Sequence, residues 1–435
     1  MKTVYVGMSG GVDSSVSALL LKEQGYNVVG VYMKNWSRDL PGMKCPWAED
    51  LADAKRVAVK LGIPFEVWDF EEDYRKKVVE YMLDEFKKGN TPNPDIMCNQ
   101  EIKFKLFYEK AMERGADFIA TGHYARAIPF SLASSLAPVV TGLASAIAPV
   151  VANAREKGIV LACTTDKDLG QNFTLQNEQV SSPLLFRAKD ENKDQTYFLY
   201  RISEEALSHT IFPIGEMKKP EVKKLAKEKG LHNAYKKESM GVCFVGEVGM
   251  KDFLKEYIDI KPGEIREIES EKVLGYHEGA VFYTIGQRHG LYLNGEKGVV
   301  NDGMPYYVVK KDVDKNIVYV SKNLNDENLW TDELRLKDVF MRQFEYISRE
   351  LTEVTTEYEG ARPVTTGASD PSPEISYSKL PLKQVLVRLR HRAPLVPAKF
   401  DGETLYFKNK IKRPASGQSA VIYDGEICLG GGIIV

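Results

Sequence analysis

One short segment near the start of the chain limits its fold more than any other feature. The apolar run Val4–Val6 leads directly into Gly7-Met8-Ser9-Gly10-Gly11-Val12-Asp13-Ser14, and helical spacing follows from residue 14 to residue 24. A strand, a glycine-rich turn and a helix in this order place free backbone N–H groups where they bind anions. The alternative is a tight turn in which Ser and Asp side chains cap the helix. The context favours phosphate binding, and the lack of a Gly-Lys-Ser/Thr ending excludes a Walker loop.

Strand and helix patterns alternate through the first 125 residues. We expect strands at 4–6, 28–33, 65–70 and 118–120, and helices at 14–24, 49–61, 73–88 and 99–114. Alternation of this kind predicts an α/β domain whose parallel sheet is covered by helices on both faces.

The pattern changes twice along the rest of the chain. From about residue 253 the sequence has short runs rich in Val, Ile and Tyr, separated by Gly, Asn and Asp, which indicates small β-barrels. We therefore expect a catalytic domain at 1–247, a small, mostly β central domain at 248–310 and a C-terminal β-barrel at 311–435. Two insertions interrupt these domains, at about 127–182 and at about 345–380, and the second is rich in Ser, Thr and Pro.

The first insertion begins with an uncharged stretch that raises the question of a membrane span. No charged residue occurs in the 28 residues from Ala127 to Ala154. Pro129, Pro138 and Pro149 interrupt the stretch, and its small residues make it only weakly hydrophobic. An inserted surface segment is the favoured interpretation, and no membrane association is expected.

Composition indicates a protein of a reducing compartment. The chain has five cysteines at wide spacings, no Cys-x-x-Cys pair, and a net charge of −2. An odd number of scattered cysteines argues against a disulfide framework, a zinc ribbon and an iron–sulfur cluster. We assign no residue as a protein metal ligand. A strand almost at residue 1 leaves no room for a targeting peptide, so a cytoplasmic location is expected.

Three further segments carry chemically useful side chains. Asp95 and Cys98 stand three residues apart at an expected helix start, where a thiol has a lowered pKa. The alternative is a helix cap at Asp95 and a buried cysteine, and the residues alone favour neither. Cys243 lies in a strand-like segment whose simplest interpretation is one buried cysteine. Residues 381–420 hold nine Lys or Arg against two acids, which favours contact with a nucleic-acid backbone over a polar strand face.

The phosphate loop resembles that of the N-type ATP pyrophosphatases, and the chain as a whole resembles the tRNA-specific 2-thiouridylase family. The further matching segments are Met33-Lys34-Asn35-Trp36, Thr91-Pro92-Asn93-Pro94-Asp95-Ile96-Met97-Cys98-Asn99, Thr121-Gly122-His123-Tyr124-Ala125-Arg126, Asn192-Lys193-Asp194-Gln195-Thr196-Tyr197-Phe198-Leu199, the Cys243 segment, Thr284-Ile285-Gly286-Gln287-Arg288 and Ser416-Gly417-Gln418. They occur in the family's order and cover most of the chain outside the two insertions. The expected fold is therefore an N-terminal domain like the adenine-nucleotide α-hydrolases.

The resemblance implies an activity. The family replaces O2 of the wobble uridine of certain tRNAs with sulfur. ATP activates the oxygen and Mg²⁺ neutralises the phosphates. A persulfide on Cys243 delivers sulfur, Cys98 acts as the second thiol, and Asp95 acts as general acid or base. The sulfur would come from a sulfur-carrier protein or a cysteine desulfurase, and the enzyme would be monomeric.

The resemblance also implies the roles of further residues. ATP would contact residues 7–14 together with Met33 and Gly122. The flipped target base would meet Asn93, Pro94 and Asp95. The residues that would contact tRNA are His123, Lys193, Asp194, Gln195, Arg388, Leu389, Arg390 and Gln418. Leu389 departs from the family, which more often has an aromatic residue there. Two other functions remain open: an ammonia-using ATP pyrophosphatase, and a tRNA-binding homologue without catalysis.

Overall fold

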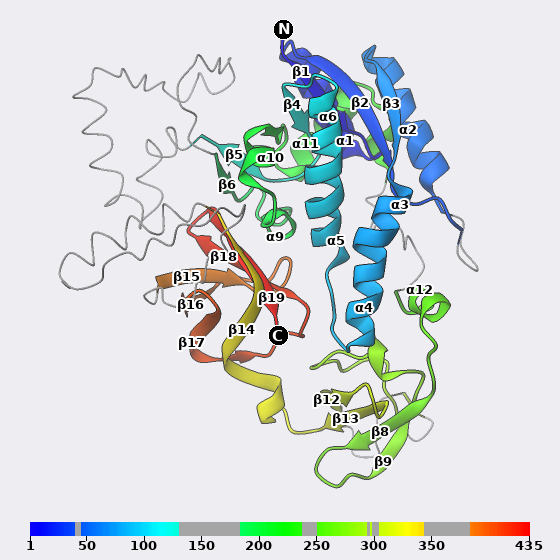
Figure 1. Cartoon of the computed structure of the whole chain (residues 1–435), viewed down its shortest axis with the longest axis vertical. Helices are drawn as coiled ribbons and strands as arrows, with labels where there is room; N and C mark the ends of the chain where they lie inside the picture. Colours follow the sequence, from blue (N-terminus) through cyan, green and yellow to red (C-terminus); the bar gives the residue numbers. More distant parts are fainter. Residues whose placement is uncertain (40–44, 130–182, 237–249, 294–295, 298–303, 343–382) are drawn as a thin grey trace, which may run out of the picture.

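The computed structural model describes residues 1–39, 45–129, 183–236, 250–293, 296–297, 304–342 and 383–435. Figure 1 shows three parts: a sheet covered by helices at the N-terminal end, a small β-rich part, and a barrel that contains the C-terminus. Two long helical segments run from the first part toward the other two. Both expected insertions, at about 127–182 and 345–380, fall almost wholly outside the described residues.

The N-terminal part is built on a five-stranded sheet in which every pairing is parallel, as the alternating pattern predicts. Its spatial order is β3-β2-β1-β4-β7. The strands are β1 (Thr3–Gly7), β2 (Asn27–Lys34), β3 (Phe65–Asp69), β4 (Phe118–Ala120) and β7 (Thr210–Ile211). The chain leaves β1 in one direction to form β2 and later returns to pair β4 on its other side. Ligands of such sheets bind at the carboxyl ends of the strands where this direction reverses.

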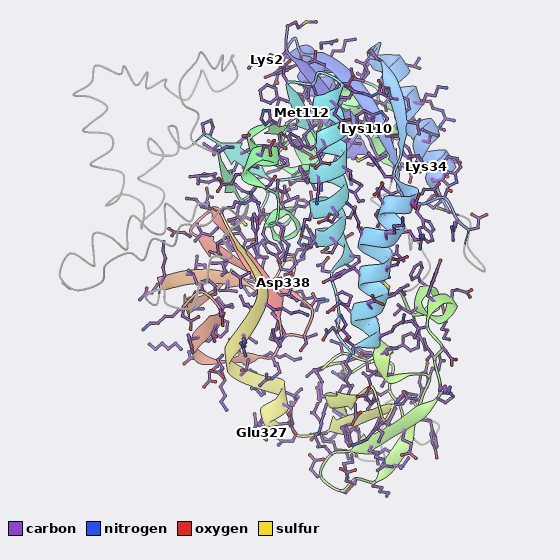
Figure 2. All side chains as sticks on the ribbon, viewed as in Figure 1. Lys2, Lys34, Lys110, Met112, Glu327 and Asp338 are labelled. Atoms are coloured by element: carbon purple, nitrogen blue, oxygen red, sulfur yellow. The ribbon has the colours of Figure 1, made fainter. Side chains whose placement is uncertain are left out.

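Helices cover this sheet and extend beyond it. The longer ones are α1 (Val12–Glu23), α2 (Trp47–Leu61) and α11 (Lys219–Glu228). Shorter ones are α9 (Thr196–Leu199), α10 (Glu204–Ser208) and the 3₁₀ turn η4 (His232–Tyr235). Lys110, labelled in Figure 2, reaches from α6 (Phe107–Glu113) to within 5.0 Å of the ring centre of Trp68 on β3. Aromatic side chains therefore fill the space between sheet and helix on this face.

The two long helical segments differ from their expected bounds. One comprises α3 (Glu71–Tyr74), the π-helical stretch η1 (Arg75–Glu80) and α4 (Tyr81–Lys87). The other comprises α5 (Pro94–Met97), the π-helical stretch η2 (Cys98–Leu106) and α6. The second helix begins at Pro94 rather than residue 99, because Pro fits the first helical position and Asn93 caps it by accepting a bond from the Asp95 N–H. Asp95 is therefore not the cap.

The central part carries α12 (Met250–Tyr257) and a six-stranded sheet with the order β11-β10-β9-β8-β13-β12. Its strands are β8 (Gly263–Glu267), β9 (Val273–His277), β10 (Tyr292–Leu293), β11 (Glu296–Lys297), β12 (Tyr307–Asp312) and β13 (Ile317–Ser321). The mostly β composition is as predicted. The boundary expected at 310 falls inside β12, however, and β13 pairs with β8, so this sheet continues to Ser321.

The C-terminal part is a barrel, as predicted. Six strands follow in the order β14-β17-β16-β15-β18-β19, and a β14–β19 pairing closes the ring. They are β14 (Trp330–Met341), β15 (Lys383–Arg388), β16 (Val396–Phe400), β17 (Thr404–Lys412), β18 (Ser419–Asp424) and β19 (Ile427–Ile434). Two short strands from the first 247 residues, β5 (Arg126–Ile128) and β6 (Leu184–Phe186), extend this sheet: β6 pairs with β19, and β5 pairs with β6. These strands therefore join the N-terminal and C-terminal parts.

The uncharged stretch at 127–154 lies outside the described residues from residue 130 onward. Among the helices that the structure describes, none is long and apolar enough to cross a membrane.

The ends of the first insertion lie beside each other. β5 and β6 are antiparallel, and Ile128 faces Leu184 in their register. A short turn can therefore replace residues 130–182. We expect this deletion to raise the free energy of unfolding by about 2 kcal/mol, because loop-closure entropy costs roughly 0.6 kcal/mol per doubling of loop length and a turn of about four residues replaces the insertion. Urea denaturation of the deleted and full-length chains measures the change. A loss of cooperative unfolding after deletion would show that the insertion is part of the core.

Candidate active site

The glycine-rich segment forms the turn between β1 and α1 at the carboxyl edge of the parallel sheet. Gly10 has a φ of +76°, and a Cβ there would lie 2.3 Å from the Asp50 carbonyl oxygen, so only glycine fits. Gly11 is the N-cap residue of α1. Met8, Val12 and Ser14 are buried, while Ser9 is exposed at the tip of the turn. The Ser9 N–H donates to the Ser14 hydroxyl, 3.2 Å away, which closes the turn.

Gly122 and Met33, the other two expected nucleotide contacts, lie beside this turn. A Cβ on Gly122, which follows β4, would be 2.6 Å from the Ser14 backbone nitrogen. A Cβ on Gly7 would be 2.9 Å from Cε of Met33 on β2. The ends of β1, β2 and β4 thus bring the expected nucleotide-binding residues together at the reversal point of the sheet.

Sequence reasoning missed two side chains that hold the turn. The Asn233 amide is buried and donates to the Gly10 carbonyl (2.8 Å) and to the Ser15 hydroxyl (2.9 Å). The Lys219 ammonium contacts both carboxylate oxygens of Asp13, at 2.8 and 2.7 Å. Both residues lie more than 200 positions from their partners. No local motif connects them, so only the fold identifies them.

Asp95 and Cys98 lie on the helix that Asn93 begins. Burial raises the pKa of the Asp95 carboxyl, while the charge of nearby Lys103 opposes the rise. Cys98 is 2% exposed, and its backbone N–H donates to the Asp95 carbonyl. The thiol therefore lies in the hydrophobic core, one turn inside the helix. The open helix end expected from the sequence is absent at Cys98.

His123 follows β4 and is almost fully buried. Its Nδ1 lies 2.8 Å from the Thr121 hydroxyl, and its ring centre is 5.8 Å from that of Phe104. Burial lowers the pKa of His123 well below its usual value, and Lys103 adds to this effect. Because Lys103 influences both Asp95 and His123, it belongs to the same group of side chains. The sequence could have indicated Lys103, because it lies eight residues after Asp95 in the same helical segment.

Two expected tRNA contacts, Asp194 and Arg388, are paired with each other instead. Arg388 donates to the Asp194 carboxylate at 2.6 Å, and the two side chains are 5% and 0% exposed. The guanidinium also lies 5.4 Å from the Tyr423 ring centre. The structure therefore gives this pair a packing role between the N-terminal part and the barrel. β15 ends at Arg388, so the alternation expected over 388–392 does not continue along the strand.

The remaining expected tRNA contacts differ in exposure. Arg390 is exposed, and Lys193 and Leu389 are half-buried. The Gln195 side-chain oxygen accepts from the Tyr124 N–H at 2.9 Å. The Gln418 amide donates to the Thr91 carbonyl at 2.7 Å. The two glutamines thus hold backbone next to the candidate site, and Arg390 has the side chain most open to a large partner.

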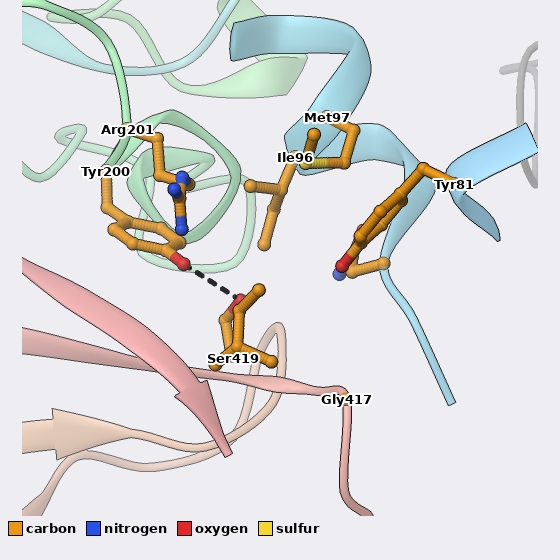
Figure 3. Close-up of a pocket in the computed structure, with 9 residues that line it drawn as sticks. Tyr81, Ile96, Met97, Tyr200, Arg201, Gly417 and Ser419 are labelled. Atoms are coloured by element: carbon orange, nitrogen blue, oxygen red, sulfur yellow. Dashed lines mark hydrogen bonds between the residues drawn. The ribbon is translucent and has the colours of Figure 1, made fainter. Parts of the chain in front are cut away.

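A small cavity separates α5, the start of the helix that carries Asp95 and Cys98, from the barrel. Figure 3 shows Ile96 and Met97 facing Ser419 across it, with Tyr81 at one side. The Tyr200 hydroxyl lies 3.2 Å from the Ser419 hydroxyl. Asn93 and Gly417 also line the cavity. The target-base residues expected from the sequence therefore lie where the N-terminal part meets the barrel.

Cys243 lies outside the described residues. Its segment leaves the described chain after Lys236 and re-enters it at Met250 on α12. Lys236 contacts Asp50 at 2.8 Å and pairs with Asp53, on the helix beside the glycine turn. On the other side, the Phe253 ring lies 6.2 Å from the Trp36 ring within the core cluster that also contains Cys98. Within the described ranges, no group of three or more His, Cys, Asp or Glu side chains is placed to hold a metal ion.

Three family models match successive parts of the chain. A "tRNA methyl transferase HUP domain" matches residues 2–247, a "tRNA methyl transferase PRC-barrel domain" matches 251–322, and an "Aminomethyltransferase beta-barrel domain" matches 375–434. The second match ends beside Ser321, where the central sheet ends. A solved "predicted subunit of tRNA methyltransferase" from Methanocaldococcus jannaschii is 21% identical over 28% of this chain and 53% of that one, and its TM-score of 0.21 is too low to bear on the fold.

Curated relatives match nearly the whole chain. A tRNA-specific 2-thiouridylase MnmA from Listeria monocytogenes (serotype 4a) is 39% identical over 99% of this chain and 94% of its own length. Proteins of the same name from Bacillus licheniformis and Bacillus subtilis are 39% and 38% identical, with the same coverage. The fold, the order of the motifs and these relatives agree, and the chain belongs to the tRNA-specific 2-thiouridylase family.

Proposed function

We propose that the chain is a tRNA-uridine 2-sulfurtransferase that acts on the wobble uridine. The uracil O2 attacks the α-phosphorus of ATP, and pyrophosphate leaves. The terminal sulfur of a persulfide on Cys243 then attacks C2, and AMP leaves with the original oxygen. The observation that carries the proposal is the 39% identity, over 99% of the chain, to a protein named for this activity.

The carboxyl edge of the sheet fits ATP. Glycine at positions 10 and 122 lets the turn pack closely against Asp50 and Gly122 against Ser14, and the turn leads into the N-terminus of α1, whose free backbone N–H groups favour a phosphate. The buried Oδ1 of Asn233 has no hydrogen-bond partner in the described part of the chain. Mg²⁺ would be bound through the phosphates, where it neutralises charge on the leaving pyrophosphate.

Two thiols and one acid supply the remaining chemistry. After sulfur reaches C2, the Cys98 thiolate attacks the bridging sulfur on Cys243. The S–S bond between Cys243 and the transferred sulfur breaks, and that sulfur stays on C2 as the thiocarbonyl of thiouridine. A Cys98–Cys243 disulfide forms at the same time, and external thiols reduce it. In the alternative order, Cys98 first releases sulfide from the persulfide, and sulfide attacks C2. Because burial raises the pKa of Asp95, this side chain holds a proton to higher pH than an exposed Asp and can transfer it at the uracil ring.

The partners follow from this chemistry. The substrate is the anticodon arm of tRNA, with the target base flipped toward Asn93, Pro94 and Asp95. Contacts with tRNA are assigned to His123, Lys193 and Gln195 of the N-terminal part, and to Arg390 and further exposed cations of the barrel. The exposed cations along and after β17 are Lys408, Lys410, Lys412 and Arg413. Sulfur arrives from a sulfur-carrier protein or a cysteine desulfurase, and the enzyme acts as a monomer in the cytoplasm.

Mass spectrometry of tRNA tests the proposal. The chain is incubated with unmodified tRNA, ATP, Mg²⁺ and a sulfide donor, and the wobble uridine should gain the mass of a sulfur-for-oxygen exchange. Thiolation by a protein donor should disappear in Cys243→Ser, because serine cannot carry a persulfide. Cys163→Ser is the matched control, since no role is assigned to that cysteine, and it should thiolate normally.

Other products would identify other functions. A mass gain of one methyl group would support the transfer named in the family models instead. Pyrophosphate release that requires ammonia and neither cysteine would identify an amide-forming ATP pyrophosphatase. Binding of tRNA without tRNA-dependent pyrophosphate release would identify a homologue without catalysis. Undiminished thiolation by Cys243→Ser with a protein donor would contradict the persulfide route.

A further inference from the structure

Lys219, which no sequence motif identifies, contacts Asp13 beside the glycine turn between β1 and α1, although the two residues are far apart in the sequence. It is the first residue of α11, and its ammonium contacts Asp13 Oδ1 and Oδ2 at 2.8 and 2.7 Å. Asp13 stands in the first turn of α1, directly after the glycine turn. A side chain 206 positions away thus binds the one carboxylate of the candidate phosphate site.

Surrounding groups fix the position of Lys219. Its backbone N–H donates to the Asp190 carboxylate at 2.8 Å. Its ammonium lies 5.8 Å from the Tyr124 ring centre, and the Tyr124 hydroxyl donates to Asp13 Oδ1 at 3.0 Å. The Lys219 side chain is 9% exposed, whereas the Asp13 side chain is 29% exposed. The cation therefore lies beneath the carboxylate, which remains partly open to the turn.

The pair matters because of what binds at the turn. A carboxylate in the first turn of a helix is favoured by the helix dipole, but it repels a second anion at the same place. Solvent and salt screen partly buried charges poorly, so the repulsion between Asp13 and a triphosphate would be strong. A lysine bound to both carboxylate oxygens cancels that charge. It also leaves the backbone N–H groups of the turn available to phosphate.

We propose that Lys219 is a positioning residue for ATP: it neutralises and orients Asp13 so that the turn accepts the triphosphate. The inference rests on the proposed use of ATP and deepens it, because it adds a residue outside the loop motif to the nucleotide site. The role requires a cation at this position and does not require a lysine as such.

Titration with a non-hydrolysable ATP analogue and Mg²⁺, without tRNA, measures the effect directly. Lys219→Met should weaken binding at least about tenfold, the effect expected from loss of a charge-assisted contact. Lys219→Arg keeps the charge and should stay within about threefold of the wild type. Lys224→Met removes the same charge from an exposed position of α11 and should bind normally. The affinity for tRNA should not change in any of these variants.

A double variant separates neutralisation from simple packing. If Lys219 acts by cancelling the charge of Asp13, then Asp13→Asn combined with Lys219→Met should bind the analogue more tightly than Lys219→Met alone. The double variant leaves no unpaired charge at positions 13 and 219. It should therefore fold, and its affinity can be compared with that of the wild type even if Lys219→Met alone does not fold. Normal binding by Lys219→Met, or weaker binding by the double variant than by the single one, would overturn the inference. Failure of the wild-type chain to bind the analogue would instead contradict the proposed function.

Discussion

Replacing Cys98 by serine should abolish thiolation while leaving ATP binding intact. We expect the rate of thiouridine formation to fall by at least about a thousandfold, because a serine hydroxyl cannot attack a persulfide or form a disulfide. The thiol lies on the helix that begins at Pro94 and is not part of the turn after β1, so affinity for an ATP analogue should stay at the wild-type value. The rate is measured as single-turnover thiolation by a protein sulfur donor, with saturating ATP and tRNA.

Cys428→Ser provides the matched control for this substitution. Cys428 is also buried, on β19 of the barrel, and burial raises the pKa of its thiol to about 12, so it does not form a thiolate near neutral pH. Placing a hydroxyl in either buried site should lower the free energy of unfolding by roughly 1–3 kcal/mol. If only Cys98→Ser loses activity, the Cys98 thiol takes part in the reaction. If both variants lose activity to a similar degree, the loss comes from reduced stability. Thiolation by Cys98→Ser near the wild-type rate would remove this cysteine from the mechanism.

The first four strands of the sheet and the glycine turn were predictable from the sequence because their signals are local. The first four strands are short runs separated by helical patterns, and all four lie within two residues of their expected bounds. The turn from Gly7 to Ser14 combines glycine conformation, helix start and strand end in eight consecutive residues. Even the true start of the second long helix has a local signal, since Asn followed by Pro is a common cap and first residue.

The contacts between distant segments were not predictable, because nothing in the local pattern encodes them. β5 and β6 have three residues each, too few to show an alternating pattern. Only the pairing of β6 with β19, and of β5 with β6, places them in the barrel sheet. Lys219 and Asn233 reach the phosphate turn through the packing of α11 and η4 beside α1. In the sequence alone, nothing distinguishes these two residues from the many other polar residues of the chain.

Arg388 shows what a count of charges leaves out, namely the burial of each charged side chain. The excess of cations over 381–420 is real, and Arg390 and the cations along β17 are exposed. Arg388 faces the segment that contains Asp194, which covers that side of the barrel. Strand periodicity tells which residues share a face, but the sequence does not tell what covers the face. A charge cluster therefore predicts a binding surface, and the fold decides which of its members reach solvent.

This burial leads to the second large expected effect: Asp194→Asn should lower the free energy of unfolding by about 3–5 kcal/mol, because it leaves the Arg388 charge buried and unpaired. Asp194 also accepts from the Ala188 N–H and from the Thr196 N–H and hydroxyl, at 2.9 to 3.2 Å. One carboxylate thus joins the segment after β6, α9 and β15. Urea denaturation, with a common slope for all variants, measures the loss.

The matched variants separate this packing role from contact with tRNA. Arg388→Met combined with Asp194→Asn should cost less than the sum of the two single changes, since no unpaired charge remains. Arg390→Ala, two positions away and exposed, should alter stability by no more than about 0.5 kcal/mol but weaken tRNA binding and reduce its salt dependence. If Asp194→Asn unfolds like the wild type and instead weakens tRNA binding, then the pair must open in the complex. The buried ion pair would in that case be a feature of the free protein alone.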